Sequence, residues 1–313
     1  MRRDTITTKI FFNSKLFLLP FFTFIILNGC SLKKIAVNSV ANALTSEGTS
    51  VFATDEDPEL VAEALPFALK TMEALLQSTP KHQRLLIGTS AGFVQYAHAF
   101  VLAPAEILEK TDLEKFRQEK LRAKKMFIRA RTYGLRALDL KHEGFSRQLQ
   151  PDAKAAVSQT KQEDVPALYW TGVAWVSAIS ISTNDMGLVA DLPIVTALLE
   201  RCLELDESWN KGAVHEVFIH FDASRSEAEG GGLAQAEDHY KRAMELCDGH
   251  AISPHVAFAE AVCIKQQDRN TFVQLLQRVL EFDVDQYPEF RLSNILAQRR
   301  ARFLLDNIED YFI

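Results

Sequence analysis

One pattern recurs at the ends of four predicted helices and restricts the fold more than any other feature of the chain. An arginine is followed by two apolar residues, an acid and a further apolar residue at 136–140, 201–205, 242–246 and 278–282. The copies start 65, 41 and 36 residues apart, which fits a helix-pair unit of about 34 residues of the tetratricopeptide type, carrying insertions of varying length. The sequence therefore predicts an all-α fold of stacked antiparallel helical hairpins, an architecture that usually binds other molecules.

The predicted helix starts support this fold, because an aspartate precedes a proline at 57–58, 164–166 and 191–193. Aspartate can cap free amides, and proline suits the first helical turn. No segment alternates with the period of two that a strand would need. A hairpin over 191–220 turns at 206–208, and the other predicted helices cover 58–77, 83–102, 112–140, 167–182, 233–247, 254–266, 270–282 and 289–310.

The helix predicted over 167–182 is the most apolar one outside the leader. Such a helix is expected at the centre of the array, since it has no polar face to turn toward water. We expect Gly172 to let a neighbouring backbone approach closely, because glycine carries no side chain.

The first 29 residues read as a bacterial lipoprotein signal. Basic residues precede an apolar run over 16–27, which is too short to cross a bilayer, and the segment 27–30 resembles a lipobox ending in Cys30. Lipidation of Cys30 would anchor the chain to a membrane. The residue after the cysteine is Ser31, and this favours anchoring on the periplasmic side of the outer membrane over the inner membrane. The predicted organisation is a signal over 1–29, a lipidated tether over 30–56 and a helical body over 57–313.

The chain without its leader carries 31 Lys and Arg against 40 Asp and Glu, a net charge of −9. An acidic exterior argues against nucleic acid or anionic lipid as a partner. Three cysteines then remain besides Cys30, an odd number that cannot form a complete disulfide framework. Cys202 is interpreted as a small packing residue, and a bridge between Cys247 and Cys263 stays open as a minor alternative.

Six segments together resemble the T-component (TatT) family of tripartite ATP-independent periplasmic (TRAP) transporters: LPFALK (65–70), YAHAFV (96–101), YGLRAL (133–138), DVPALYWTGVAW (164–175), GAVHE (212–216) and NILAQRRA (294–301). The resemblance covers nearly all of the body. It implies a periplasmic lipoprotein of degenerate tetratricopeptide hairpins that forms homotrimers with a cleft or pore in each subunit. It also implies a substrate-binding protein of the transporter as partner and small ligands, hydrophobic ones among them, as cargo.

Two motifs suggest enzymes but fit a helical protein better. The G-x-S-x-G pattern around Ser90 needs a strand-to-helix turn above a parallel sheet, and no such sheet is predicted. His215 and His220 are five residues apart, whereas zinc-binding H-E-x-x-H needs a separation of four. Five residues rotate the second imidazole about 140° from the first, so Glu216 and His220 are interpreted as an i, i+4 pair. We expect no enzyme, no cofactor and no bound metal.

The ligand and pore candidates are the aromatic residues and basic groups of the body. Aromatic side chains often line small-ligand pockets, although the favoured alternative is that they are core ridges of the array. The two arginines could face a channel, although a solvated face paired to local acids is the favoured alternative. The full candidate set is Tyr169, Trp170, Trp175, Trp209, His215, Arg299 and Arg300.

The leading functional prediction is a lipid-anchored, non-enzymatic component of a TRAP-type uptake system. It would bind the substrate-binding protein and convey a small ligand. The alternative is a general tetratricopeptide scaffold for cell-envelope assembly that grips a peptide on its concave face.

Overall fold

The structure, a computed structural model, describes residues 51–313 and is made of helices without strands over that range. This confirms the all-α class. The predicted leader, Cys30 and the tether up to residue 50 lie outside the described residues. The elements are α2 (Pro58–Ser78), α3 (Gln83–Tyr96), η1 (Ala97–Leu102), α4 (Ala103–Glu106), α5 (Leu113–Lys141), α6 (Phe145–Leu149), α7 (Ala153–Ser158), η2 (Gln162–Asp164), α8 (Val165–Ser180), α9 (Met186–Val189), α10 (Leu192–Asp206), η3 (Trp209–Gly212), α11 (Ala213–Ala223), η4 (Glu227–Glu229), α12 (Leu233–Leu246), α13 (Ser253–Phe258), η5 (Ala259–Cys263), α14 (Ile264–Gln266), α15 (Arg269–Glu281), η6 (Pro288–Phe290), α16 (Arg291–Asp306) and η7 (Ile308–Asp310).

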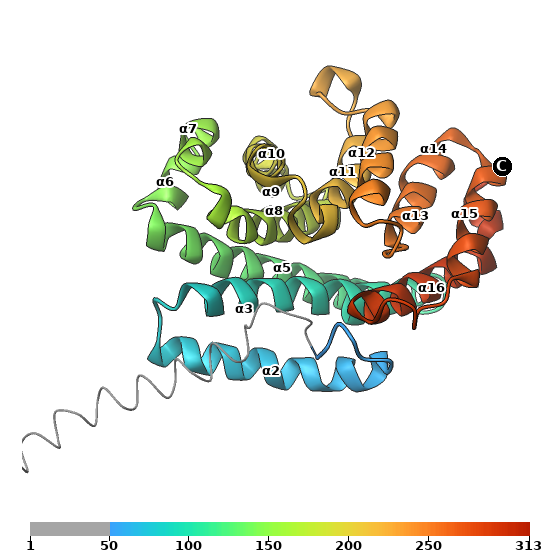
Figure 1. The fold of residues 1–313 in the computed structure, drawn as a ribbon, viewed down its shortest axis with the longest axis horizontal. Coiled ribbons are helices and arrows are strands. Elements are labelled where there is room, and N and C mark those ends of the chain that lie inside the picture. The colour runs from blue at the N-terminus through green and yellow to red at the C-terminus, as the bar shows by residue number, and fades with distance from the viewer. Residues whose placement is uncertain (1–50) are drawn as a thin grey trace, which may run out of the picture.

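The helices form a stack that curves back on itself. Figure 1 shows α2, α3, α5, α8 and α10 as successive layers, after which α11 to α16 bend round until α16 lies beside α2. The amide of Leu292 in α16 donates to the carbonyl of Ala53 at 3.0 Å. Arg299 of the same helix donates to both carboxylate oxygens of Glu59 in α2, at 2.5 and 2.9 Å. The two ends of the array are therefore in contact.

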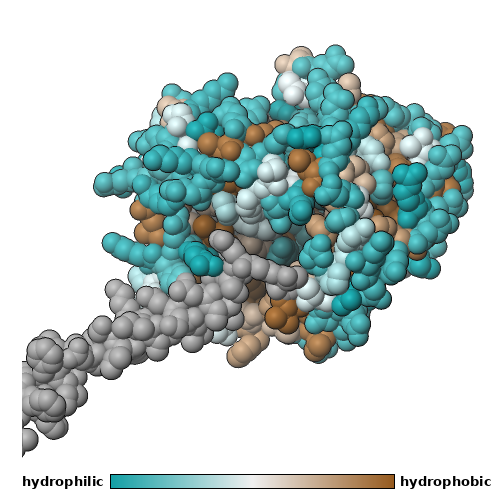
Figure 2. All heavy atoms as spheres, in the orientation of Figure 1, coloured by the Kyte–Doolittle hydropathy of each residue, from teal (hydrophilic) through white to brown (hydrophobic). Residues whose placement is uncertain are grey.

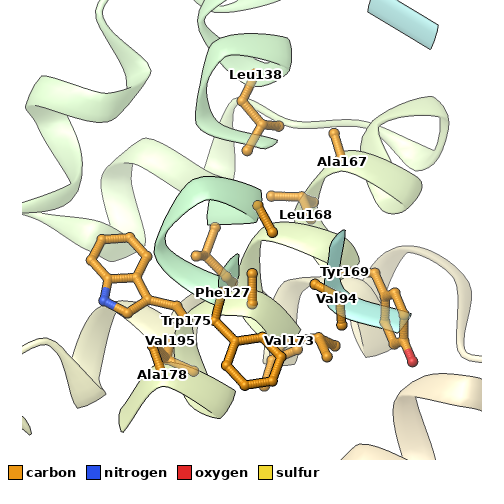
Figure 3. Packing of buried hydrophobic residues seen from close by; sticks show 14 of the residues in the cluster. Val94, Phe127, Leu138, Ala167, Leu168, Tyr169, Val173, Trp175, Ala178 and Val195 are labelled. Carbon is orange, nitrogen blue, oxygen red and sulfur yellow. The ribbon is translucent and has the colours of Figure 1, made fainter. Parts of the chain in front are cut away.

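The core lies where α8 packs between α5 and α10. Ala174 and Ala178 of α8 and Phe127 of α5 are fully buried, and Figure 3 shows Ala178 and Phe127 among their neighbours. Burying a large apolar side chain of this kind stabilises the fold by about 1.5–3 kcal/mol. The apolar helix predicted for the centre of the array is thus found there.

Close packing of α5 on α8 depends on a glycine, although not on the one predicted. A Cβ atom at Gly134 would lie 3.2 Å from Thr171 Cα and 2.1 Å from its hydroxyl. At Gly172 the neighbour is the side chain of Leu199, at 2.8 Å, and not a backbone. The expected close backbone approach therefore occurs at Gly134.

Two helices predicted as continuous contain π-helical turns. The one over 83–102 becomes π-helical at η1, and the one over 254–266 at η5. Among the described residues, one helix, Gln83–Glu106, is long and apolar enough to span a membrane by length and composition. More than half of its most apolar stretch is buried, and it packs on α2, α5 and α8. These contacts are those of a core helix.

Two sequence features have structural explanations. Ser90 is fully buried, and its hydroxyl donates to the carbonyl of Ala130 at 2.8 Å, so the G-x-S-x-G segment lies within packed helix. The thiols of Cys202, Cys247 and Cys263 are all buried and free. The alternative of a bridge between Cys247 and Cys263 is therefore wrong.

Candidate functional site

A cavity of about 670 Å³ lies within the curve of the array and is partly open to solvent. Its walls come from α3 and η1, α8, the start of α11, α12, α13 and η5, and α16. Both π-helical turns contribute to these walls, η1 through His98 and η5 through Glu260. Turns of this type are rare and are often found at functional sites. Phe52 and Ala53, which precede α2, also line the cavity.

One wall is aromatic. Tyr169 and Trp170 of α8 line the cavity, and their ring centroids are 4.9 Å apart in an edge-on arrangement. The ring of Trp209 packs behind Tyr169 at 4.8 Å. Burial, and then the charge of Glu216, raise the pKa of Tyr169, so the phenol keeps its proton and can act as a donor.

Two imidazoles also contribute to the cavity wall. His98 and His220 both line it, and both have accessible area although they sit well inside the protein. The Ser177 hydroxyl donates to the carbonyl of Val173 at 2.7 Å and contacts His98 Nε2 at 2.8 Å, so we assign His98 Nε2 as the donor. Burial, and then the charge of His220, lower the pKa of His98 to about 4. Both rings are neutral near pH 7, since burial also lowers the pKa of His220.

Arg300 joins three elements at the edge of the cavity. Its Nε donates to Glu260 Oε1 at 2.9 Å, and its Nη1 donates to the Glu106 carboxylate. Two acids thus surround one base, and the group has a net negative formal charge. Because these residues belong to α16, η5 and α4, the cluster also holds the last helix against the first half of the chain.

Glu216 of α11 is in a different situation from Glu260. It lines the cavity, partly buried, and the Ser253 hydroxyl is the group that stabilises its charged form. Burial is the largest influence and raises its pKa. Removal of a carboxyl group from water disfavours its charged form, and a nearby cation would favour that form.

A second hollow of about 390 Å³ adjoins the cavity, between α2, α4 and α16. The two hollows share four lining residues, Ala99, Phe100, Leu296 and Arg300. Arg299, Ile107 and Pro58 line the second hollow only. The two hollows therefore lie side by side, and the second one extends along α2.

The predicted site residues divide between the cavity and other places. Tyr169, Trp170 and Arg300 line the cavity, Trp209 packs behind it, and Arg299 lines the second hollow. Both arginines are paired to acids, as their alternative reading proposed.

Trp175 and His215 lie away from the cavity. The indole of Trp175 donates to Asp191 Oδ2 at 3.1 Å, and Figure 3 shows it on the side of α8 opposite to Tyr169. His215 Nδ1 lies 2.8 Å from His239 Nδ1, and its Nε2 lies 3.2 Å from Glu207. Both side chains hold helices together.

Several polar residues of the cavity wall were not among the sequence candidates, and they include His98, Glu216, His220 and Glu260. Composition alone does not single out Glu216 and His220, because α11 also carries His215 and Asp222. Glu216 pairs with Ser253 and not, as the sequence predicted, with His220. Across residues 51–313, no group of three or more His, Cys, Asp or Glu side chains is arranged to hold a metal ion.

These features define an all-helical protein whose first and last helices meet around a partly polar internal cavity. Residues 54–312 match the family described as the TRAP transporter T-component, and the chain belongs to that family. An uncharacterized protein of Treponema pallidum (strain Nichols) is 31% identical, with the similarity covering 91% of this chain and 94% of that protein. The family resemblance noted in the sequence is thereby confirmed. A component of TRAP transport belongs to the cell envelope.

Proposed function

We propose that this protein is a lipid-anchored periplasmic component of a TRAP-type uptake system and does not catalyse a reaction. It binds a small ligand with an apolar body in the internal cavity and exchanges it with the substrate-binding protein. The observation that carries this proposal is the cavity itself, which combines aromatic and aliphatic walls with a few polar groups. Ligand sites usually have this composition.

The second hollow supports conveyance in addition to binding. Because it shares Ala99, Phe100 and Leu296 with the cavity, a ligand leaving the interior would pass between α2, α4 and α16 without crossing a helix. Anchoring through Cys30 keeps this exit near the membrane, since a tether of about 20 residues spans at most roughly 70 Å.

Self-association into a homotrimer is part of the proposal. Leu60 and Phe67 of α2 have 55% and 78% of their area exposed, and they lie seven residues apart on one face. Figure 2 shows a mostly hydrophilic surface with apolar groups at its lower edge, where α2 lies. The terminal helix of a stacked array normally turns a polar face outward, so an apolar outer face on α2 favours a protein neighbour.

The alternative scaffold function needs an open concave surface for a peptide. Contacts of Leu292 with Ala53 and of Arg299 with Glu59 close the concave side of this array. The closed arrangement suits a small ligand better than a peptide chain.

A pull-down from envelope extract tests the partner. The mature lipoprotein should recover a TRAP solute-binding protein, and recovery of outer-membrane assembly factors in its place would support the scaffold alternative.

A cavity-filling substitution tests the ligand site in the chain from residue 30 onward, with Cys30→Ser so that no lipid is attached. Ala99→Trp, on the wall shared by both hollows, should abolish binding of 1-octanol measured by titration calorimetry. The control is Ala155→Trp on the exposed surface of α7, which should bind like the parent chain. Equal binding by both variants would contradict the cavity assignment.

A further inference from the structure

Charge pairing in the cavity wall points to the chemistry of the ligand head group. Arg300, the base beside the cavity, already donates to Glu260 and Glu106. Arg299 in the second hollow is bonded through both terminal nitrogens to Glu59. An anionic ligand would have to displace these acids, so neither arginine is available to a carboxylate without breaking a charge-assisted pair.

Glu216, in contrast to the two arginines, is available to pair with a cationic ligand. Its carboxyl group has the Ser253 hydroxyl as partner, and no cation of the described chain is among the groups that shift its pKa. Lys211 and Glu289 also line the cavity, but both are exposed at its rim. A partly buried carboxylate without a cation is costly, and an incoming cation would remove that cost.

Aromatic rings line the same cavity as this carboxyl group. Tyr169, Trp170 and Glu216 are all part of its wall, and Trp170 packs edge-on against Tyr169. The charge of Glu216 also raises the pKa of the Tyr169 phenol. The faces of tyrosine and tryptophan rings attract cations. A carboxylate beside such rings is a suitable environment for an ammonium group.

We propose that the cavity selects a ligand with an apolar body and a protonated amine head, which binds to Glu216 beside Tyr169 and Trp170. This inference rests on the proposed ligand-binding function and adds the class of ligand to it. In the complex the ammonium group forms an ion pair with the Glu216 carboxylate and supplies the cation that this carboxylate lacks. No covalent bond is formed or broken.

Three probes with the same eight-carbon chain test the proposal: octylammonium, 1-octanol and octanoate. We measure their binding at pH 7.5 by titration calorimetry, using the chain from residue 30 with Cys30→Ser. Octylammonium should bind about tenfold more tightly than octanol, as expected for one charge-assisted bond, and octanoate should bind more weakly than octanol.

Variants at position 216 separate recognition of the amine head group from binding of the apolar body in the cavity. Glu216→Gln should bind octanol normally but lose the preference for octylammonium. Glu216→Asp, which keeps the carboxylate, should retain part of the preference. Glu281→Gln removes an exposed acid of α15 and should behave like the parent chain.

The outcomes distinguish this inference from the proposed function. If octanoate binds best, or if Glu216→Gln keeps the preference for octylammonium, the amine head group is wrong while octanol binding still supports an apolar ligand site. If none of the three probes binds, the ligand site and the head-group inference both fail.

Discussion

The two faces of α11 carry similar residues in different surroundings. Glu216 and His220, four residues apart, face the cavity. His215 and Asp222, seven residues apart, face α12, where His239 contacts both of them, at 2.8 and 3.3 Å. Residues four and seven positions apart share a face of an α-helix, whereas five positions place them about 140° apart. One helix therefore contributes to both a ligand cavity and a structural network.

The difference between these faces lies in how their polar groups are paired. On the α12 side, Asp222 accepts from Arg225 and contacts His239, and Glu207 contacts His215 and Arg242. Networks of this kind fix how helices pack. On the cavity side, Glu216 has only a hydroxyl partner that favours its charge. Polar groups left poorly paired inside a protein call for a functional explanation, and a ligand supplies one here.

The largest effect is expected on the network side. Asp222→Ala leaves the guanidinium of Arg225 and the ring of His239 without their acceptor, and Asp222 is only 3% exposed. Breaking a buried pair in this way should lower the free energy of unfolding by about 3 kcal/mol. The control is Asp238→Ala in α12, where the side chain is 81% exposed. This substitution should change the free energy of unfolding by about 0.5 kcal/mol or less. Denaturant unfolding measures both, and equal effects would remove the distinction between the two faces.

A smaller change in the free energy of unfolding is expected for substitutions at His98 and His215, two histidines whose pKa values are lowered alike. Burial lowers the pKa of both His98 and His215 to about 4. At pH 7.5, His215→Gln should cost about 1–2 kcal/mol because His239 and Glu207 lose a partner. His98→Gln should cost less, since His98 has Ser177 as its hydrogen-bond partner and otherwise faces the cavity.

At acid pH, each histidine variant should come closer in stability to the parent chain. A lowered folded-state pKa gives stability that is fully present above the unfolded value of 6.5 and is lost as the pH falls toward 4. Each glutamine variant should therefore lose less stability than the parent chain between pH 7 and pH 4.5, as followed by thermal unfolding. A parallel decline in all three proteins would show that neither imidazole stays neutral in the fold.

Local signals in the sequence predicted the helices well. Asp57 and Pro58 give the start of α2, and Asp112 the start of α5, because caps and prolines act on the adjacent backbone alone. The π-helical turns at η1 and η5 were not predicted, and neither was the contact of α16 with the segment before α2. These features depend on packing between residues far apart in the chain, which no local pattern encodes.

The candidate site could be predicted only in part, because local patterns do not encode contacts between residues far apart in the chain. Tyr169, Trp170 and Trp175 belong to one apolar helix, and the sequence shows that Trp175 points about 140° away from Trp170. It does not show which of these directions meets the cavity. His98 and Glu260 lie in π-helical turns, where the α-helical period fails, so periodicity could not place their side chains on the wall.

The smallest change in stability is expected at Glu216, and its sign is the informative part. A raised folded-state pKa means that the folded chain holds the proton more tightly than the unfolded chain, so this stability is present below the ordinary carboxyl pKa of 4.5 and is lost as the pH rises through the folded value. Glu216→Gln, which keeps the shape and has no charge to desolvate, should therefore be as stable as the parent chain at pH 4.5 and more stable at pH 7.5, by up to about 1 kcal/mol. Denaturant unfolding at both pH values measures this difference. A substitution that improves stability while it removes amine selectivity identifies a carboxyl group retained for binding, whereas a loss of stability at pH 7.5 would place Glu216 with Asp222 as a structural residue.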